Sequence, residues 1–451
     1  MSHKLAIINP RTSTAIESTE PLNIMILGTY LKNAGIQVKI IDEVAGDDVV
    51  KETKEFSPDL VGFTSTTCSY PRAAQLMKTI KNLGYTTIIG GVHASALPES
   101  VLNEGFDMVV VGEGEKTLLK IVSEERQKGI FRTEKADILK AEEIPLPDRT
   151  LVNMEFYIRV KDRTPHDPNL DFVPIGAKMA TMLSSRGCPF NCIFCHNTWR
   201  GIPVRFLRPE VMIEEIERLI SHYGIRYIWF LDDEFFLNKS RASSFCEQLI
   251  RKRIKIHWAT SVRPDSLDEG LVSIAALAGC KRLAFGFESG SQRILDVLNK
   301  RSNVEENLAI ASLCHKYNIE VSGLIMVGNP TETKYDIKLT RDFIKKSKPD
   351  SLCISVLTPF PGTRLWEWCR EQGYLPDARR IDFSNFYYTY ATIQIPATFS
   401  TKEVERIKRN MLIEAYLFNQ KMRKRFILKM FKHPIAMLWK ILGYFYANKN
   451  Q

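Results

Sequence analysis

The sequence predicts an α/β protein with two parallel-sheet domains: a doubly wound sheet, then a partial barrel of six strand–helix units, followed by a helical tail. Two observations predict this class. Short apolar runs alternate with helical segments of about a dozen residues along most of the chain, as in parallel sheets covered by helices. Of the 451 residues, 44% are hydrophobic and 25% charged. This composition is that of a globular protein and excludes a largely disordered chain.

Residues 1–135 predict the doubly wound sheet. The strand-like runs are KLAII, VKIID, DLVGFTS, TTIIGG and MVVVGEG, and two intervening helical segments stop at Gly35 and Gly84. Glycine commonly ends helices, because it adopts left-handed backbone angles freely. The order predicts a Rossmann-like sheet with a ligand site at the carboxyl edge of its strands. No G-x-G-x-x-G motif opens a helix, so a nicotinamide or flavin dinucleotide is not expected.

Residues 136–175 are polar and interrupted by prolines, which predicts a linker, and we expect His166 to be an exposed residue of it. Residues 176–395 resume the alternation. Six units are slightly fewer than the eight of a full barrel, which predicts a partial, TIM-like (β/α)6 barrel. The six strand-like runs are KMATMLSS, YIWFLDD, KIHWATS, RLAFGFESG, EVSGLIMVG and SLCISVL.

Residues 396–451 predict a basic helical extension. The net charge is +10, but residues 401–451 hold 12 Lys or Arg against 3 Asp or Glu, so the rest of the chain is nearly neutral. A nucleic-acid enzyme usually spreads basic residues over its working domain, so no nucleic acid is expected. The tail predicts either a helix packed on the barrel or an interfacial segment that binds anionic lipid.

Cys188, Cys192 and Cys195 lie within the segment RGCPFNCIFCHNTW, where Pro189 and Asn191 indicate a loop. A structural zinc site needs four protein ligands, and a conventional electron-transfer cluster needs four cysteines. A [4Fe–4S] cluster held by three thiolates leaves one iron open. The other six cysteines occur singly in apolar segments and are predicted to be buried: Cys68, Cys246, Cys280, Cys314, Cys353 and Cys369.

The C-x-x-x-C-x-x-C motif, with Phe194 before its last cysteine, resembles the hallmark of the radical S-adenosylmethionine (SAM) superfamily. The resemblance covers most of the chain. It implies that the open iron binds the amine and carboxylate of SAM. One electron then cleaves SAM to methionine and a 5′-deoxyadenosyl radical, so an electron donor such as flavodoxin or ferredoxin is implied.

The resemblance also implies SAM-binding residues at the ends of later barrel strands. FLDDEFF would lie near the methionine amine, although a solvated acidic turn is the alternative, and GFESGS would contact the ribose and methionine portions. SGLIMVGNP would pass close to the adenine. Arg263 would pair with a carboxylate at the barrel mouth, and a surface ion pair is the alternative. The implied cofactor-binding residues are Phe194, Asp232, Asp233, Arg263, Glu288, Ser289, Gly323 and Gly328.

The N-terminal segments PDLVGFTSTTCSY, IIGGVHAS and VVVGEGE resemble the cobalamin-binding domain of one subgroup of this superfamily, to which TPFPGTRLW also points. One departure is that the Asp-x-His-x-x-Gly motif, whose histidine coordinates cobalt, is absent. The loop after the first strand reads NPRTSTA, and His93 is expected to be a packed loop residue. The implied cobalamin-binding residues are Thr64, Ser65, Thr66, Thr67, Gly90 and Gly91.

The resemblance implies a cobalamin-dependent methyltransferase that acts on an unactivated carbon of a small-molecule or lipid-like substrate. Two alternatives stay open. One is a radical SAM cyclase, dehydratase, dehydrogenase or carbon–carbon coupling enzyme without cobalamin, and the other is an iron–sulfur or zinc electron carrier or sensor. Nine cysteines and no signal-like N-terminus predict a cytoplasmic protein. The tail would contact the inner face of the membrane, and the catalytic residues stay unknown.

Overall fold

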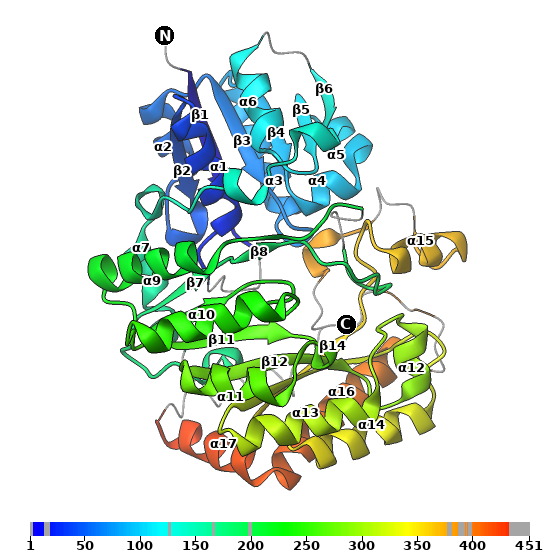
Figure 1. The fold of residues 1–451 in the computed structure, drawn as a ribbon. Helices are drawn as coiled ribbons and strands as arrows, with labels where there is room; N and C mark the ends of the chain where they lie inside the picture. The colour runs from blue at the N-terminus through cyan, green and yellow to red at the C-terminus, as the bar shows by residue number, and fades with distance from the viewer. Residues whose placement is uncertain are drawn as a thin grey trace. The chain divides into compact units, whose positions relative to one another are not determined.

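The computed structural model describes residues 3–12, 19–124, 128–164, 167–196, 201–376, 381–386, 393, 395 and 399–432. His166 and residues 433–451 of the tail lie outside the described residues. The chain divides into two compact units (Figure 1). Unit 1 consists of Met1–Val160, Ala180–Leu207 and Pro359–Tyr387. Unit 2 consists of Lys161–Met179, Arg208–Thr358 and Tyr388–Gln451.

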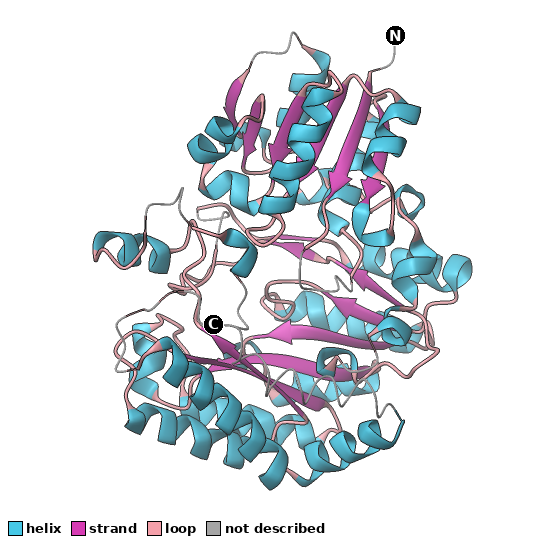
Figure 2. Ribbon diagram, turned by 180° about the vertical axis from the view of Figure 1, so that it is seen from behind, coloured by secondary structure: helices cyan, strands magenta, loops and turns pink. Residues whose placement is uncertain are grey.

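Unit 1 contains a six-stranded parallel sheet in the order β2-β1-β3-β4-β5-β6, with helices on both faces (Figure 2). The first five strands are those that the sequence predicts, and β6 is an additional, half-exposed edge strand of four residues. The strands are β1 (Lys4–Asn9), β2 (Gln37–Asp42), β3 (Leu60–Thr64), β4 (Thr87–Gly90), β5 (Met108–Val111) and β6 (Gly129–Arg132).

Apolar helix faces and strands form the core of unit 1. The helices are α1 (Leu22–Asn33), α2 (Val49–Phe56), α3 (Tyr70–Asn82), α4 (Val92–Ala96), α5 (Pro98–Glu104), α6 (Glu115–Ser123), α7 (Met154–Ile158) and α15 (Arg364–Glu371). On one face Leu76 and Ile80 of α3 pack against Val61 of β3. Burial of such side chains contributes about 1.5–3 kcal/mol each.

The segment expected to be a linker is packed over part of its length. Tyr157 of α7 is buried, and its hydroxyl donates to Asp42 Oδ2 at 2.7 Å. Arg149 is also buried, 3.2 Å from Glu20. These contacts place residues 136–160 within unit 1, so the boundary between the units does not follow the sequence-based one.

The second sheet has the strand order β14-β13-β12-β11-β10-β7, which follows the chain, and its described pairs are parallel. Strands β10 to β14 belong to unit 2, whereas Ala180–Met182 of β7 fall in unit 1. An open sheet of six such strands is a partial barrel. All six predicted strands are present: β7 (Met179–Met182), β10 (Tyr227–Phe230), β11 (His257–Val262), β12 (Cys280–Glu288), β13 (Glu320–Val327) and β14 (Ser351–Val356).

Helices follow the strands of unit 2 and end at the C-terminal pair α16–α17. Val404, Met411 and Ala415 of α16 are buried, so this helix packs on the unit as one interpretation of the tail predicts. None of the helices in the described part of the chain is long and apolar enough to cross a bilayer. The helices are α8 (Val160–Arg163), α9 (Pro209–Tyr223), α10 (Lys239–Arg251), α11 (Glu269–Leu277), α12 (Gln292–Val297), α13 (Val304–Lys316), α14 (Lys334–Ser347), α16 (Thr401–Phe418) and α17 (Gln420–Lys432).

Candidate functional site

The three cysteines lie on one loop of unit 1. Cys188 is half-buried, Cys192 buried and Cys195 exposed, and none of them forms a disulfide. The Cys195 amide donates to the Cys192 carbonyl at 3.3 Å, and the Leu365 amide donates to the Ile193 carbonyl at 2.9 Å. The cysteine-bearing part of this loop, residues 188–195, is therefore tied to the start of α15.

The donor set of this loop fits a [4Fe–4S] cluster with one open iron. Three thiols supply three ligands, and a fourth protein ligand from the next residue is disfavoured because His196 Nδ1 lies 3.2 Å from the Pro361 carbonyl oxygen. Within the described ranges, no three Cys, His, Asp or Glu side chains are gathered closely enough to hold a metal ion. The three thiols thus lie on one loop, but they are not gathered around a single metal position.

Two short strands close the base of the cysteine loop. β8 (Ser185–Arg186) pairs antiparallel with β9 (Arg205–Phe206), which sets Arg186 opposite Arg205. Glu113 and Glu115, from the VVVGEGE segment after β5, neutralise these two charges. Arg186 lies 2.7 Å from Glu115 and 3.6 Å from Glu113. Arg205 Nη1 donates to Glu113 at 2.9 Å, and a second, shorter bond joins the same two side chains.

We call these four side chains the arginine–glutamate cluster. They are largely buried, where two arginines side by side repel one another unless carboxylates pair with both. The cluster attaches both ends of the cysteine loop to the carboxyl edge of the first sheet. It was not predicted, although an arginine on either side of the cysteine motif and the acidic repeat GEGE are visible in the sequence.

The predicted cobalamin loops meet at the carboxyl edge of the first sheet. Gly91 has φ +101°, and a Cβ there would lie 2.7 Å from the Ser65 carbonyl oxygen, so only glycine fits. The Ser65 amide donates to the Gly90 carbonyl at 3.2 Å. The loops after β3 and β4 therefore touch through their backbones and form a cradle that a larger residue would fill.

The cradle retains an unsatisfied polar atom. Ser65 Oγ is buried and has no hydrogen-bond partner in the described part of the chain. Such an unsatisfied hydroxyl is expected where a bound ligand supplies the partner. Thr64 Oγ1 accepts from Asn23 Nδ2 at 3.3 Å, and Thr66 Oγ1 lies 3.2 Å from Ser69 Oγ. Thr67 Oγ1 lies 3.4 Å from His93 Nδ1. The backbone and Ser65 thus fit a cofactor edge, whereas Thr66 and Thr67 stabilise the turn.

His93 is a packed residue, as expected. Its ring stacks on Tyr70 at 4.1 Å and meets the edge of Phe383 at 4.8 Å. Burial lowers the pKa of His93 to about 3, so the ring is neutral at physiological pH. Residues 13–18, which include part of the loop lacking the cobalt-binding histidine motif, lie outside the described residues.

In unit 2 three acidic residues follow β10, and they differ in environment. Asp233 is exposed, whereas Asp232 and Glu234 are buried. Glu234 Oε2 accepts from the Arg263 amide at 2.6 Å, while Oε1 is buried without a partner among the described residues. Burial raises the pKa of Glu234 to about 7. The turn is therefore not simply a solvated acidic loop.

Glu288 ends β12 in the left-handed region, with φ +61°. Its carboxylate accepts from Lys300 Nζ at 2.8 Å. A Cβ on Gly286 would lie 2.5 Å from Glu288 Oε1 and 2.7 Å from Lys300 Nζ, so glycine makes room for this ion pair. A non-glycine residue with such a φ is strained and is held by its surroundings.

Two other predicted residues of this region make internal bonds. Ser289 is fully buried, and its Oγ lies 3.1 Å from Thr340 Oγ1 while accepting from the Ser291 amide. The Arg263 guanidinium pairs with Asp265 at 3.0 Å and donates to the Lys300 carbonyl at 2.7 Å. Arg263 thus pairs with a carboxylate and also holds the segment that carries Lys300, the partner of Glu288.

Gly328 directly follows β13, and Gly323 lies inside that strand opposite Leu352. Gly328 has φ +81°, and its amide donates to Glu332 Oε2 at 2.7 Å. Glu332 Oε1 accepts from Asn329 Nδ2 at 2.8 Å, and burial raises the pKa of Glu332 to about 7. Glu332 was not predicted, and it fixes the turn in which Asn329 Oδ1 is buried without a partner within the described residues.

The carboxyl ends of parallel strands meet at one edge of a sheet, so the turns after β10, β12 and β13 lie at the same edge of unit 2. That edge offers buried carboxyl and amide oxygens, some of them unsatisfied, to a polar ligand with amine groups. The cysteine loop and the cobalamin loops belong to unit 1. The donor groups of each unit match one part of the predicted chemistry.

Two family models match the chain. The model described as the radical SAM superfamily matches residues 182–344, and the model described as the B12 binding domain matches residues 11–122. An uncharacterized methyltransferase of Pyrococcus horikoshii is 31% identical over 449 residues, covering 92% of each chain.

Two further relatives have more specific names. The anaerobic magnesium-protoporphyrin IX monomethyl ester cyclase of Cereibacter sphaeroides is 28% identical, over 76% of this chain and 58% of its own length. The bacteriochlorophyllide d C-12(1)-methyltransferase of Chlorobaculum tepidum is 26% identical, over 86% and 81%.

Solved structures share the fold. The radical SAM methyltransferase TsrM of Kitasatospora setae, with tryptophan and a SAM analogue bound, has a TM-score of 0.68 at 20% identity, over 82% of this chain and 76% of its own. The cobalamin-dependent radical enzyme OxsB has a TM-score of 0.70 at 17% identity, over 92% and 66%.

Proposed function

Because the chain belongs to the radical SAM superfamily, in the group that carries a B12 binding domain, we propose that it methylates an unactivated carbon of a small-molecule or lipid-like substrate. The family's cofactors are a [4Fe–4S] cluster, SAM and cobalamin. When bound, they supply a methyl group and a 5′-deoxyadenosyl radical that removes hydrogen from the substrate carbon. The observation that carries the proposal is that the cysteine loop and the cobalamin loops share one compact unit, in which the arginine–glutamate cluster ties the cysteine loop to the segment after β5.

In this proposal the chain's residues hold the cofactors, orient SAM and shield the radical from water. Cys188, Cys192 and Cys195 hold the cluster as thiolates. Residues at the carboxyl edge of unit 2 orient SAM. The ion pair Glu288–Lys300 supplies one negative and one positive group there, and the turn at Gly328 approaches the adenine. The proposed SAM-orienting residues at this edge are Asp232, Asp233, Arg263, Glu288, Ser289 and Gly328. Gly323, inside β13, and Phe194, on the cysteine loop of unit 1, complete the proposed set.

Cobalamin would occupy the cradle after β3 and β4. Gly90 and Gly91 permit close backbone approach, and Ser65 Oγ supplies an unsatisfied hydroxyl. Thr64, Thr66 and Thr67 complete this loop. His93 is enclosed by aromatic rings, so we assign it no cobalt-binding role.

Relatives named for bacteriochlorophyllide d and magnesium-protoporphyrin IX monomethyl ester make a tetrapyrrole the first substrate to test. A one-electron donor such as flavodoxin or ferredoxin would reduce the cluster. We place the protein in the cytoplasm, at the inner face of the membrane, with its basic tail as the contact. The six basic residues and absent acidic residues of α17 favour that contact.

A second candidate function is radical cyclisation without methyl transfer, which the relative named as a cyclase favours. The electron-carrier and sensor alternatives are not retained, since the relatives and solved structures compared above are named as enzymes. Product mass separates the two remaining functions, because methylation adds one CH₂ unit and cyclisation does not.

The first test is the metal content of protein purified without oxygen from cells supplied with cobalamin. We expect about four irons and about one cobalt per chain. Assays with methyl-deuterated SAM should then transfer the labelled methyl group to the product. About four irons with no cobalt, even after reconstitution, would favour the second candidate function.

A further inference from the structure

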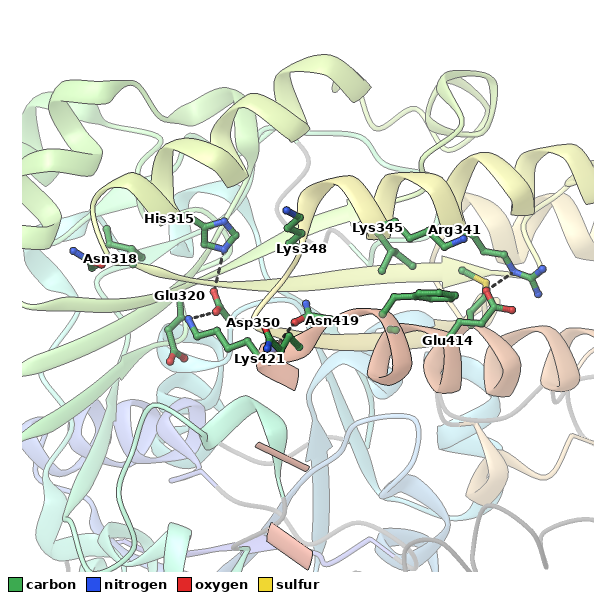
Figure 3. A pocket seen from close by; sticks show the side chains of 16 residues that line it. His315, Asn318, Glu320, Arg341, Lys345, Lys348, Asp350, Glu414, Asn419 and Lys421 are labelled. Carbon is green, nitrogen blue, oxygen red and sulfur yellow. Dashed lines mark hydrogen bonds and ion pairs between the residues drawn. The ribbon is translucent and has the colours of Figure 1, made fainter. Parts of the chain in front are cut away.

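Unit 2 contains a groove at the edge of its sheet opposite to the candidate site. It has a volume of about 680 Å³ and lies between α14 and α16, beside the ends of α13 and α17 (Figure 3). Glu320, the first residue of β13, and Asp350, just before β14, lie at its base. The turns proposed above to orient SAM follow the carboxyl ends of β10, β11, β12 and β13, and none of their residues lines the groove, so the groove is a separate site.

The acidic residues of the groove are all paired. Asp350 accepts from His315 at 3.2 Å and also pairs with Lys421. Glu414 lies 3.5 Å from Arg341. Glu320 lies 2.7 Å from Arg282, outside the groove lining. These acidic side chains therefore leave no unbalanced negative charge in the groove.

Two lysines at the groove have no carboxylate partner among the described residues. Within the described ranges, neither Lys345 nor Lys348 has a carboxylate at ion-pair distance, and Lys345 Nζ lies 4.8 Å above the ring of Phe418. Figure 3 shows both lysines on the α14 side, facing the α16 side that carries Glu414. The groove thus carries an excess of positive charge that an anion would balance.

The groove and its rim are also apolar. Ile344, Met411 and Ala415 line it, and Phe418, 65% exposed, stands at its edge. Large apolar side chains are exposed on both C-terminal helices, which is unusual unless a partner covers them. They are Ile413, Leu417 and Phe418 on α16, and Ile427, Leu428 and Met430 on α17.

The basic residues of α17 lie beside these apolar side chains. Its sequence, QKMRKRFILKMFK, contains six Lys or Arg and no Asp or Glu. Lys421, Arg423 and Lys424 are exposed. Exposed apolar side chains next to basic ones match a bilayer surface, where acyl chains accept the former and anionic head groups attract the latter.

We infer that the groove and the exposed faces of α16 and α17 form a docking site for anionic membrane lipid. In this site, which we call the lipid groove, Lys345 and Lys348 bind the head group and Phe418 with the apolar lining receives the start of an acyl chain. The inference deepens the proposed membrane contact, on which it rests, by locating the lipid site away from the chemistry. A polyanion such as RNA fits less well, since it would leave the exposed apolar side chains in water.

The test is co-sedimentation of the full chain with vesicles of phosphatidylcholine alone or with 30% phosphatidylglycerol. Wild-type protein should bind the anionic vesicles at least about tenfold more strongly, and added salt should weaken this binding. The double variant Lys345→Glu/Lys348→Glu should lose about tenfold or more in affinity for anionic vesicles. Phe418→Ser should weaken binding at all salt concentrations.

Matched variants control for net charge and for exposed apolar area. Lys51→Glu/Lys54→Glu on α2 makes the same charge change in unit 1, and Ile250→Ser removes an exposed apolar residue of α10. Neither should change vesicle binding. Circular dichroism and SAM cleavage should stay unchanged in all four variants, because none of these residues belongs to the candidate site.

Hydrogen exchange locates the contact directly. Anionic vesicles should slow exchange in residues 341–348 and 411–421, whereas inorganic phosphate alone should not. If wild-type protein does not bind vesicles, both the membrane contact and the lipid groove are wrong. If it binds, but the groove variants bind equally well and only α17 is protected, the lipid groove is wrong while the membrane contact stands. Equal protection by phosphate would identify an anion site in place of a lipid site.

Discussion

At the scale of single residues, buried carboxyl groups distinguish the two edges of unit 2. At the carboxyl edge, Glu234 and Glu332 are enclosed and their pKa values are raised to about 7. At the opposite edge, Asp350 and Glu320 are paired with cations. A carboxyl group that titrates near neutral pH can donate or accept a proton close to a bound ligand. Burial opposes the charge of Asp350, but hydrogen bonds from His315 and Lys421 outweigh it and lower the pKa of this carboxyl group.

Glu332 gives a pH-dependent prediction. Its folded-state pKa, about 7, lies above the ordinary glutamate value of 4.5, so the folded state binds the proton more tightly and stability falls as pH rises between these values. Glu332→Gln should remove this contribution. The stability of the variant relative to wild type should therefore rise by about 1–3 kcal/mol from pH 5 to pH 8.

Denaturant unfolding of both proteins at the two pH values measures this change. Glu306→Gln, at an exposed position of α13, is the control and should show no such pH dependence. A constant difference between Glu332→Gln and wild type across the range would show that the Glu332 carboxyl group does not titrate there.

Cys192 gives a second prediction at this scale. It is the most buried of the three loop cysteines. Cys192→Ala should remove one of three cluster ligands and abolish formation of 5′-deoxyadenosine, measured by chromatography after reduction of the reconstituted protein. Cys353→Ala, at a half-buried position of β14, should retain the activity. Retained cleavage in Cys192→Ala would refute the assignment of the cluster.

At the scale of elements, the sequence predicted long periodic segments well. All six strands of the second sheet and five of the first were found, because mostly apolar segments of four to nine residues bounded by glycine and polar residues indicate burial directly. β6 was missed since it is short and half-exposed, and β8 and β9 were missed because two residues carry no periodicity.

Long-range contacts explain the other differences. Residues 136–160 have the composition of a linker, yet Tyr157 binds Asp42, a partner 115 residues away that no local pattern reveals. The motif residues Glu288 and Gly328 could be found because they directly end or follow predicted strands. Lys300 and Glu332, which hold them, lie in loops of ordinary composition, so only the fold identifies them.

The arginine–glutamate cluster gives a prediction at the element scale. Arg205→Met removes one of the two cations that pair with the buried Glu113, so the free energy of unfolding should fall by about 3–5 kcal/mol. The variant should also bind less iron on reconstitution, because the base of the cysteine loop is no longer held. Adding Glu113→Leu to this variant should restore much of the stability and of the iron content. The remaining Arg186 and Glu115 then form a neutral pair at 2.7 Å.

Thermal melting and iron analysis of the single and double variants test this coupling. Arg132→Leu breaks an exposed pair with Glu99 and is the control, with an expected effect of about 0–1 kcal/mol and full iron content. A double variant as unstable as the sum of its two single changes would show that the four charges do not act as one group.

At the scale of the whole molecule, the proposed ligand sites lie on separate surfaces. The loops proposed to bind cobalamin and the cysteine loop belong to unit 1, whereas the turns proposed to orient SAM and the proposed lipid groove belong to opposite edges of the unit 2 sheet. The excess positive charge of the sequence lies almost entirely in the C-terminal helices and the residues after them. Salt should therefore weaken lipid binding and leave the binding of cobalamin nearly unchanged.

This distribution predicts distinct patterns of protection from hydrogen exchange. A ligand that binds only the folded state stabilises it by about 2.7 kcal/mol at a concentration 100 times its Kd, and protection is greatest where the ligand makes contact. Cobalamin should thus slow exchange in residues 64–69 and 90–95 of unit 1. A SAM analogue should slow exchange in residues 232–236, 286–291 and 328–332 of unit 2.

Protection by cobalamin confined to unit 2, or none at a saturating concentration, would contradict the assignment of the cradle. Ser65→Val should reduce cobalamin protection and leave SAM protection intact, because the loops after β3 and β4 contain none of the turns proposed to orient SAM.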